Sequence, residues 1–432
     1  MTKADFELPQ GFHSGIFGTY DGKWLFLAGR TNGMHTFAND NDNFPPNKQN
    51  TEVIVVDFKT KKIKSRSLFN SNSGLSTSQI DLLSVTSPQF YQEGKTLYMT
   101  GGYGVNSNTG LFDTKDALTA IDVPGLIHWV TKPYRGETAA QHIRHIYDPI
   151  FQVTGGEMTR IGDHSTLLVF GQNFTGFYVP DTNGDYTEVV RRFNIIDDGQ
   201  YLAVQIKDSN PVNPDSNFRR RDLNIVPSIE AKNGKWKPYL VAYSGVFTDT
   251  DGPWTVPVTI SPTGHCLMEN PSHKTTFKQG MNNYVSANIG LFTKNAEEMF
   301  TILLGGISYG FFENGQFQTS NELPFINQVT AIKRDNSGHF KQYLLKVEYP
   351  VILSTQSNSG NPLLFGAAAE FVPAEGLSAF KNGVLKLDKL LHKRSTLIGY
   401  IVGGIQSTVP NTSNRSDSAA SPYIFKVKLK PQ

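Results

Sequence analysis

The chain has 432 residues, of which 12% are aromatic, 18% are charged and 39 are glycine, and its formal net charge is +2. This small net charge excludes the concentrated basic surface that binding to nucleic-acid phosphates needs, and no run approaches the roughly 18 apolar residues of a membrane-spanning helix. Cys266 is the only cysteine, which excludes intramolecular disulfides and paired-cysteine metal sites.

Residues 1–5 at the N-terminus lack the apolar stretch of a secretory signal. The protein is therefore either cytoplasmic, or secreted or periplasmic with its signal peptide already removed. The second interpretation is slightly favoured, and with it a bacterial source.

Taken in chain order, the sequence repeats an apolar strand that ends in glycine and is followed by a long polar loop. Internal repetition at a spacing of tens of residues is typical of folds built from one repeated unit. Six strands of this type are expected, at residues 25–29, 97–102, 167–171, 240–245, 302–306 and 400–404.

Each of these strands belongs to a larger unit. An apolar segment with small residues precedes it, and two further strands follow the loop, as at residues 52–57 and 63–68 of the first unit. Such a unit predicts a four-stranded antiparallel sheet, and six units predict an all-β protein. The preceding segments, expected to be inner strands, are residues 13–17, 86–90, 147–151, 225–229, 285–289 and 365–369.

The two ends of the chain are predicted to complete one sheet together. The last unit stops after its third strand, residues 423–429, whereas residues 5–9 precede the first unit. We therefore expect the N-terminal segment to supply the missing strand. No linker rich in Ser, Gly or Pro interrupts the series, so residues 1–432 are interpreted as a single domain. Residues 384–391 are expected to form a short helix or hairpin inserted in the last unit.

Three units end their strand in a glycine pair, Gly101-Gly102, Gly305-Gly306 and Gly403-Gly404, and the others keep one glycine. With the strands and loop that follow, this is the kelch pattern, and the chain resembles a divergent protein of the kelch and galactose-oxidase-like superfamily. The resemblance implies a six-bladed β-propeller with four-stranded antiparallel blades, closed by the N-terminal strand. The units are longer than the usual repeat of about 50 residues. Of the regular Tyr and Trp of the consensus, only Trp129 lies near its expected place.

The loops after the six glycines are long, whereas turns such as residues 93–95 are tight. Long loops on one side of a rigid scaffold commonly carry binding function. Their aromatic side chains can stack on sugar rings or contact another protein, although they can also simply hold a loop in place. The candidate ligand-binding residues are Tyr103, Phe174, Tyr178, Phe247 and Tyr309, together with Arg135 from the connection before the third unit.

Residues 135–145 hold the densest mixture of groups suited to proton transfer and anion binding, and are expected to lead to the mouth of the third unit. The candidate catalytic residues of a sugar-processing enzyme, similar to an epimerase or mutarotase, are Glu137, His142, Arg144 and His145. The alternative is a salt-bridged loop between two sheets. Glu230, on a predicted inner strand, is a further candidate acid.

The densest basic run is Arg219-Arg220-Arg221, which is followed at once by Asp222. Adjacent opposite charges are typical of a solvated loop, and this is the favoured interpretation. The alternative is an anion-binding site.

One acidic loop has the spacing of metal ligands. Asp181, Asn183 and Asp185 offer oxygen atoms at alternate positions, which suits Ca²⁺. The loop lacks the glycine and the final acid of an EF-hand, so turns stabilised by Asx side chains explain it better. Cys266 lies on a predicted outer strand, away from where a galactose-oxidase copper site would be, and no cofactor is expected.

The favoured interpretation is a monomeric, non-catalytic binding protein that recognises a glycan or a protein partner through its long loops. The alternative is the sugar-processing enzyme, with its site at the central mouth. The two predict different surfaces. A binding module should present a broad, shallow aromatic face, whereas an enzyme should have a deep polar pocket with an acid, a base and an arginine.

Overall fold

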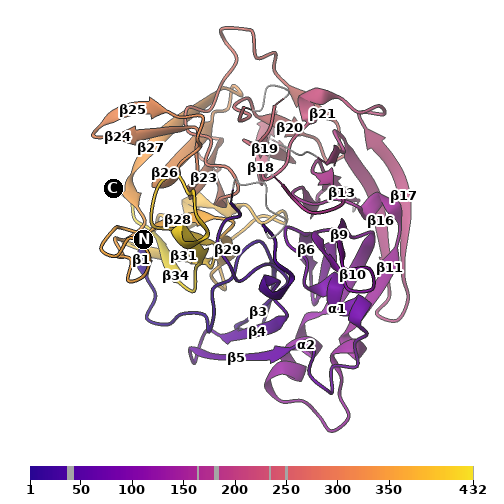
Figure 1. Ribbon diagram of the computed structural model, residues 1–432. Coiled ribbons are helices and arrows are strands. Elements are labelled where there is room, and N and C mark those ends of the chain that lie inside the picture. The colour runs from indigo at the N-terminus through magenta and orange to yellow at the C-terminus, as the bar shows by residue number, and fades with distance from the viewer. Residues whose placement is uncertain (37–42, 163–164, 180–183, 233–234, 249–251, 432) are drawn as a thin grey trace.

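The protein is built mainly of β-strands, which form sheets placed in chain order around the middle of the molecule (Figure 1). The computed structural model describes residues 1–431 except 37–42, 163–164, 180–183, 233–234 and 249–251. Within these residues, five sheets have four strands and a sixth has five, and each corresponds to one unit of the sequence repeat. The all-β prediction is therefore confirmed.

Sheets I to III come from the N-terminal half of the chain, and in each the antiparallel strands lie side by side in sequence order. Sheet I contains β2 (Ile16–Tyr20), β3 (Lys23–Leu27), β4 (Glu52–Asp57) and β5 (Lys62–Ser67). Sheet II contains β6 (Gln89–Glu93), β7 (Thr96–Thr100), β10 (Ala117–Asp122) and β11 (Ile143–Tyr147). Sheet III contains β12 (Glu157–Arg160), β13 (Thr166–Val169), β16 (Val190–Asp197) and β17 (Leu202–Asn210).

Sheets IV to VI follow the same order, except that sheet V gains a short parallel strand and sheet VI takes its fourth strand from the N-terminus. Sheet IV contains β18 (Asn224–Lys232), β19 (Lys235–Tyr243), β20 (Val258–Ile260) and β21 (Cys266–Met268). Sheet V contains β22 (Ala287–Thr293), β23 (Glu298–Ile307), β26 (Phe325–Arg334), β27 (Phe340–Glu348) and β30 (Leu385–Lys386). Sheet VI contains β29 (Glu370–Pro373), β31 (Thr396–Val402), β34 (Ile424–Leu429) and β1 (Thr2–Lys3).

Short elements occupy the connections, and no helix in the described part of the chain is long and apolar enough to cross a membrane. The helices are α1 (Thr77–Leu83), α2 (Val123–Thr131) and α3 (Leu387–Leu390). Single 3₁₀ turns lie at Pro46–Lys48, Ala139–His142, Pro149–Phe151, Ser216–Phe218 and Arg415–Asp417. The small sheets pair β8 (Tyr103–Asn106) with β9 (Leu111–Thr114), β14 (Gln172–Asn173) with β15 (Asp185–Tyr186), β24 (Gly310–Glu313) with β25 (Gln316–Thr319), and β32 (Ile405–Ser407) with both β28 (Leu364–Ala367) and β33 (Ser418–Ala420).

The second strand of each sheet is apolar on both faces because neighbouring sheets cover both. Successive side chains of a strand point to opposite faces, so adjacent residues such as Leu25 and Phe26 enter two different cores. Apolar clusters join Leu25 to Leu97 (sheets I and II), Leu118 to Leu168 (II and III), Leu167 to Leu240 (III and IV), Tyr243 to Leu303 (IV and V), Leu304 to Ile401 (V and VI) and Val402 to Phe26 (VI and I).

The glycine pairs mark a change of backbone direction at the end of these strands. In all six units both residues of the pair have φ between +52° and +100°, a region that glycine enters without steric cost. The second residue is glycine in all six units, and neighbouring atoms lie close to the place where its side chain would be. At Gly29 a Cβ atom would lie 2.3 Å from the carbonyl oxygen of His13. The first position carries Ala28, Phe170 or Ser244 in the units that lack a full pair.

In four of the units, the second glycine also donates a backbone hydrogen bond to the next unit. Gly29 donates its N–H to the carbonyl of Val85 (2.7 Å), and the same bond links the last unit to the first, from Gly404 to Phe12 (2.8 Å). Between them, Gly102 donates to Val153 (2.8 Å) and Gly171 to Arg220 (2.9 Å).

One residue per unit, which we call a waist residue, also has positive φ, between +48° and +67°. The waist residues are Ser14, Ser87, Gly155, Asp222, Val285 and Ala368. All are among the described residues, and five backbone bonds join them in order. These bonds run from the N–H of Ser14 to Ala368 O (3.4 Å), Ser87 to Ser14 O (2.9 Å), Gly155 to Ser87 O (3.2 Å), Asp222 to Gly155 O (2.8 Å) and Ala368 to Val285 O (2.6 Å).

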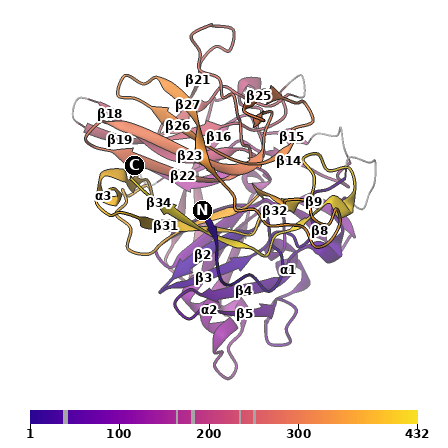
Figure 2. The same ribbon diagram turned by 90° about the vertical axis from the view of Figure 1, so that its left-hand side faces the viewer.

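The N-terminus joins the last sheet, as predicted, but through different residues. Strand β1 pairs with β34, with Thr2 opposite Lys426, and Figure 2 shows the N-terminus beside β34. The segment expected to be the strand, residues 5–9, instead runs beside the start of β34, where Leu8 donates its backbone N–H to Pro422 O (2.8 Å). Asp5 forms ion pairs with Lys61 and Lys426, and the regular pairing ends before it.

The prediction for the start of the third unit was wrong. Residues 147–151 form the end of β11 and a 3₁₀ turn, because Pro149 begins the turn and the Asp148 carboxylate accepts the Ile150 N–H (3.0 Å). The inner strand of sheet III is β12 instead. The expected insert at residues 384–391 is confirmed as β30 and α3.

Candidate functional site

A cavity of about 410 Å³ opens among the loops that follow the glycine pairs. We call it the loop cavity. Every unit contributes residues to the lining of the loop cavity, so the cavity lies where the six units meet. One lining residue from each unit in order is Phe44, Tyr103, Tyr178, Phe247, Leu323 and Ile405.

A second cavity, of about 390 Å³, is lined mainly by the first strands of the sheets, and we call it the strand cavity. The six waist residues line both cavities, so they lie between the two. Asp222 is the charged member of this group, in a place where other units carry small or apolar side chains.

Aromatic side chains form one wall of the loop cavity. Tyr103 meets Phe44 and Phe174 edge-on, at centroid distances of 5.5 and 5.6 Å. Its hydroxyl donates to Gly176 O (2.7 Å) and accepts the Tyr178 N–H (3.1 Å). Burial raises the pKa of Tyr103 well above its usual value. These contacts hold the wall in place.

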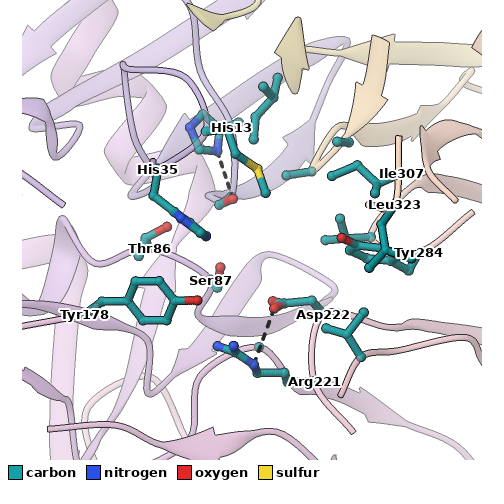
Figure 3. A pocket seen from close by; sticks show the side chains of 18 of the residues that line it. His13, His35, Thr86, Ser87, Tyr178, Arg221, Asp222, Tyr284, Ile307 and Leu323 are labelled. Carbon is teal, nitrogen blue, oxygen red and sulfur yellow. Dashed lines mark hydrogen bonds and ion pairs between the residues drawn. The ribbon is translucent and has the colours of Figure 1, made fainter. Parts of the chain in front are cut away.

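An arginine and a carboxylate lie near Tyr178 in the same cavity (Figure 3). The Arg221 Nε is 3.8 Å from the Asp222 carboxylate. The guanidinium lies over the rings of Tyr178 and Phe247, at 5.7 and 4.9 Å from their centroids. Burial raises the pKa of Asp222, and the charge of Arg221 opposes that shift.

Two histidines of the lining stay neutral at physiological pH. Burial lowers the pKa of His13 to about 3, with the charge of Arg30 adding to the shift. Burial lowers the pKa of His35 to about 4. Because carbonyl oxygens only accept, His13 Nε2 must donate to Asn32 O (2.9 Å) and His35 Nδ1 to Thr36 O (2.8 Å), which fixes both tautomers.

The strand cavity has a different chemistry. Glu157 of β12 and Glu370 of β29 both line it, and its described lining contains no Lys, Arg or His. Burial raises the pKa of Glu370 to about 8. Burial, with the charge of Glu370, raises the pKa of Glu157 well above its usual value.

Four of the six residues predicted to bind a ligand line the loop cavity. They are Tyr103, Phe174, Tyr178 and Phe247. Tyr309 and Arg135 line neither cavity. Arg135 is exposed, in the connection between α2 and β11.

Two of the candidate catalytic residues belong to a cluster at the end of α2. The Glu137 carboxylate lies 3.0 Å from His128 Nδ1 and 3.0 Å from His142 Nε2. Asp122 lies 3.4 Å from the other ring nitrogen of His142, and the Tyr134 N–H donates to Glu137 (2.8 Å). The cluster fastens this connection to α2.

The other two candidates lie on β11, the outermost strand of sheet II. Arg144 forms an ion pair with Asp197 of sheet III, and His145 Nδ1 contacts Thr119 Oγ1 (2.8 Å). None of the four candidates lines either cavity, so the expectation that residues 135–145 lead to the central mouth was wrong. Residues 135–145 lie at the outer edge of sheet II because the chain reaches β11 only after it has formed the inner strands of that sheet.

Those of the remaining candidates that the structure describes also lie outside the cavities. Glu230 is 3.5 Å from Arg334, with which it forms an ion pair. Cys266 is buried on β21, the outermost strand of sheet IV, as expected. Asp181 and Asn183 fall outside the described residues, and Asp185 is exposed on β15. Within the described ranges, no group of three or more His, Cys, Asp or Glu is placed to hold a metal ion.

Sequence reasoning missed the charged residues of the cavities. The basic run at 219–221 was interpreted as solvated, but Arg220 and Arg221 are only 0% and 8% exposed. Burial lowers the pKa of Arg220 to about 9. Only the structure aligns the six waist positions, and among them Asp222 is the only charged residue.

No protein-family model matches the chain, and no curated protein matches it either. Among solved structures, the chain is similar to the structure of YjhT, with a TM-score of 0.46 and 11% identity. The similarity covers 97% of this chain and 98% of that one.

Proposed function

We propose that the protein is a six-bladed β-propeller of the kelch type that binds a small sugar in its loop cavity. In this proposal the six sheets are the blades. The proposal is supported by apolar clusters that join each sheet to the next and sheet VI to sheet I. It is also supported by the bond from Gly404 to Phe12 and by the pairing of β1 with β34.

The observation that carries the binding proposal is the convergence of aromatic and hydrogen-bonding side chains in one cavity. A concave site of about 300–1,000 Å³ suits a small molecule, and the loop cavity has a volume of about 410 Å³. A partner protein would need a broad surface instead. The site therefore favours a ligand of one or two sugar rings over a protein.

The side chains suit the two kinds of surface that a sugar presents. The C–H faces of a sugar ring pack on aromatic rings, which Tyr178 and Phe247 provide. Hydroxyl groups need both donors and acceptors, and Asn32, Gln172 and Asn411 lie in the same lining.

A titration of neutral and acidic monosaccharides and disaccharides by isothermal calorimetry tests this proposal. An aromatic contact contributes about 1 kcal/mol, so Tyr178→Ala should weaken binding by about five- to tenfold. Tyr309→Ala is the matched control, because that loop tyrosine lies outside both cavities. Equal losses in the two variants, or no binding by any sugar, would contradict the proposal.

A second function, conversion of the bound sugar, is favoured by one observation. Asp222 and His35 both point into the loop cavity (Figure 3). Burial raises the pKa of Asp222 and lowers that of His35 to about 4, so an acid and a neutral base meet one ligand. NMR can follow interconversion of sugar anomers with catalytic amounts of protein. Acceleration that Asp222→Asn abolishes supports an enzyme, and an unchanged rate contradicts it.

A further inference from the structure

The strand cavity holds two glutamates that the proposed sugar site does not use. Glu157 comes from β12 of sheet III and Glu370 from β29 of sheet VI, so two distant parts of the chain bring these side chains to one cavity. The charge of Glu370 adds to the effect of burial in raising the pKa of Glu157. The two carboxyl groups therefore lie close enough to repel each other when both are ionised.

Neither carboxyl group is compensated by a cation within the described part of the chain. Both residues are partly buried, burial is the largest cause of the raised pKa of each, and no hydrogen bond lowers either pKa. The described lining holds no Lys, Arg or His, and its other carboxylate, that of Asp222, lies 3.8 Å from Arg221 Nε. A buried carboxylate without a cation is unfavourable, so a positively charged ligand would stabilise the ionised pair.

A buried hydroxyl group of the same lining also lacks a partner. Ser286 is 5% exposed, and its Oγ atom has no hydrogen-bond partner among the described residues. Together with the two carboxyl groups, it provides three acceptor groups in the lining of one cavity. A protonated primary amine has three N–H donors on one nitrogen, so each donor has an acceptor available.

The aromatic residues of the lining favour an organic cation over a metal ion. Phe17, Phe90 and Phe371 line the cavity, and the rings of Phe17 and Phe90 meet edge-on at a centroid distance of 5.5 Å. Aromatic rings attract an ammonium group and also pack on an alkyl chain. Ca²⁺ needs about six to eight oxygen ligands, whereas the described residues contain no group of three or more His, Cys, Asp or Glu placed to hold a metal ion.

We propose that the strand cavity binds a primary aliphatic amine in its protonated form, and that Glu157, Glu370 and Ser286 receive the ammonium group. The cavity has a volume of about 390 Å³, which suits a small molecule and leaves room for an alkyl chain beside Phe17 and Phe90. This site is separate from the sugar site, because the waist residues lie between the two cavities.

Two ligands of similar shape that differ in charge test this inference. Pentylamine hydrochloride and 1-pentanol are each titrated by isothermal calorimetry. Because hydrogen bonds between charged groups are the strong ones, the amine should bind more than about tenfold tighter than the alcohol. Calcium chloride is the third titrant, and it should not compete with the amine.

Variants without one carboxylate should bind the amine more weakly. Glu157→Gln and Glu370→Gln keep the shape of the side chain, and each should weaken pentylamine binding by about tenfold or more. Glu375→Gln, at an exposed position outside both cavities, is the matched control and should leave the affinity unchanged. Tyr178→Ala, in the loop cavity, should also leave it unchanged. Thermal unfolding checks that each variant is folded.

The affinity for the amine should rise with pH. Burial raises the pKa of Glu370 to about 8 and that of Glu157 well above its usual value, whereas an aliphatic amine keeps its proton to about pH 10. Between about pH 6 and pH 9 the carboxyl groups ionise and can pair with the amine. The double variant Glu157→Gln/Glu370→Gln should lose this rise. A rise that persists would belong to Asp222, the third acidic group of the described lining, and would overturn the role of the two glutamates.

The other outcomes also decide the inference, independently of the sugar site. Equal affinities for pentylamine and 1-pentanol would overturn it, and so would a loss in Glu375→Gln as large as that in Glu370→Gln. Displacement of the amine by Ca²⁺ would indicate a metal site and overturn it as well. If sugars bind and the amine does not, the sugar site stands and only the amine site fails. If the amine binds and sugars do not, the proposed function fails and the amine site stands.

Discussion

At the scale of single residues, buried ionisable groups make stability depend on pH. The neutral imidazole of His13 accepts from Ser14 Oγ and donates to Asn32 O, both at 2.9 Å. In the unfolded chain this histidine binds a proton near pH 6.5, whereas burial delays protonation in the folded protein to about pH 3. The unfolded state therefore gains protons first as the pH falls, and the stability contributed by neutral His13 is lost between these values.

The pH profile of unfolding tests the role of His13. The free energy of unfolding, measured in urea at several pH values between 7 and 4, should fall by up to about 1.4 kcal/mol per pH unit from this group. His13→Gln should flatten the profile. His273→Gln, at an exposed position, should leave the slope unchanged. Equal slopes for all three proteins would contradict the assignment.

Glu370 should have the opposite pH dependence. Burial raises its pKa from 4.5 to about 8, so between these values the unfolded chain ionises while the folded protein keeps its proton. Stability is therefore lost as the pH rises through this range. Glu370→Gln should raise the midpoint of thermal unfolding at pH 8 and change it little at pH 4.5.

An exposed glutamate provides the control for this measurement. Glu375→Gln, five residues away on the surface, should not shift the midpoint at either pH. A Glu370→Gln variant that is destabilised equally at both pH values would show that the carboxyl group is not held protonated in the strand cavity.

The residues of the loop cavity differ in how well the sequence predicts them. Tyr103, Phe174 and Tyr178 are recognisable because large aromatic residues are unusual in long polar loops. Arg221 and Asp222 are adjacent opposite charges, a pattern that is usually solvated. Their burial depends on six loops that converge from distant parts of the chain, and no local pattern reports that convergence.

At the scale of elements, the glycine pair is the feature that the units share most closely. A Cβ atom at Gly29 would lie 2.3 Å from His13 O and 2.8 Å from Gly15 N, both backbone atoms. Gly94 also has positive φ, but a Cβ atom there would have no atom within 4 Å apart from those of its chain neighbours.

Alanine substitutions at these two glycines separate backbone strain from crowding. Both variants incur the cost of a left-handed residue, about 1–2 kcal/mol. Gly29→Ala must also displace the backbone of residues 13–15, so it should lose at least about 2 kcal/mol more than Gly94→Ala in urea unfolding. Equal losses of unfolding free energy in the two variants would show that crowding at the glycine pair does not contribute to stability.

The second strand of each unit was predictable because its apolar run is continuous and ends in glycine. One first strand was not predictable. Strand β12, Glu157–Arg160, has one buried residue in four, so it lacks an apolar pattern. The sequence predicts the strand at residues 147–151 instead, because residues 150–151 are apolar. Asp148 and Pro149 in that segment favour a turn. A first strand whose face borders a cavity has little apolar pattern to recognise.

At the scale of the whole molecule, the N-terminal segment should stabilise the arrangement of all six sheets. It supplies β1, and it buries Ala4 and Leu8 in the cluster shared by sheets VI and I. Burial of one leucine side chain contributes about 1.5–3 kcal/mol. Removal of residues 1–9 should therefore lower the free energy of unfolding by at least about 2 kcal/mol.

A milder change separates the buried contact from the loss of a strand. Leu8→Ala keeps β1 and should lose part of that stability, about 2–3 kcal/mol at most, without changing the secondary structure seen by circular dichroism. A protein without residues 1–9 that unfolds like the intact chain would contradict the role of the N-terminus in completing sheet VI.

The central claim is that the six units surround one site for a small sugar. A crystal structure of the protein soaked with the tightest-binding sugar of the calorimetric panel tests it most directly. The account predicts electron density for the sugar in the loop cavity, packed against Tyr178 and Phe247. Density for the sugar on an outer surface, with the loop cavity empty, would contradict it.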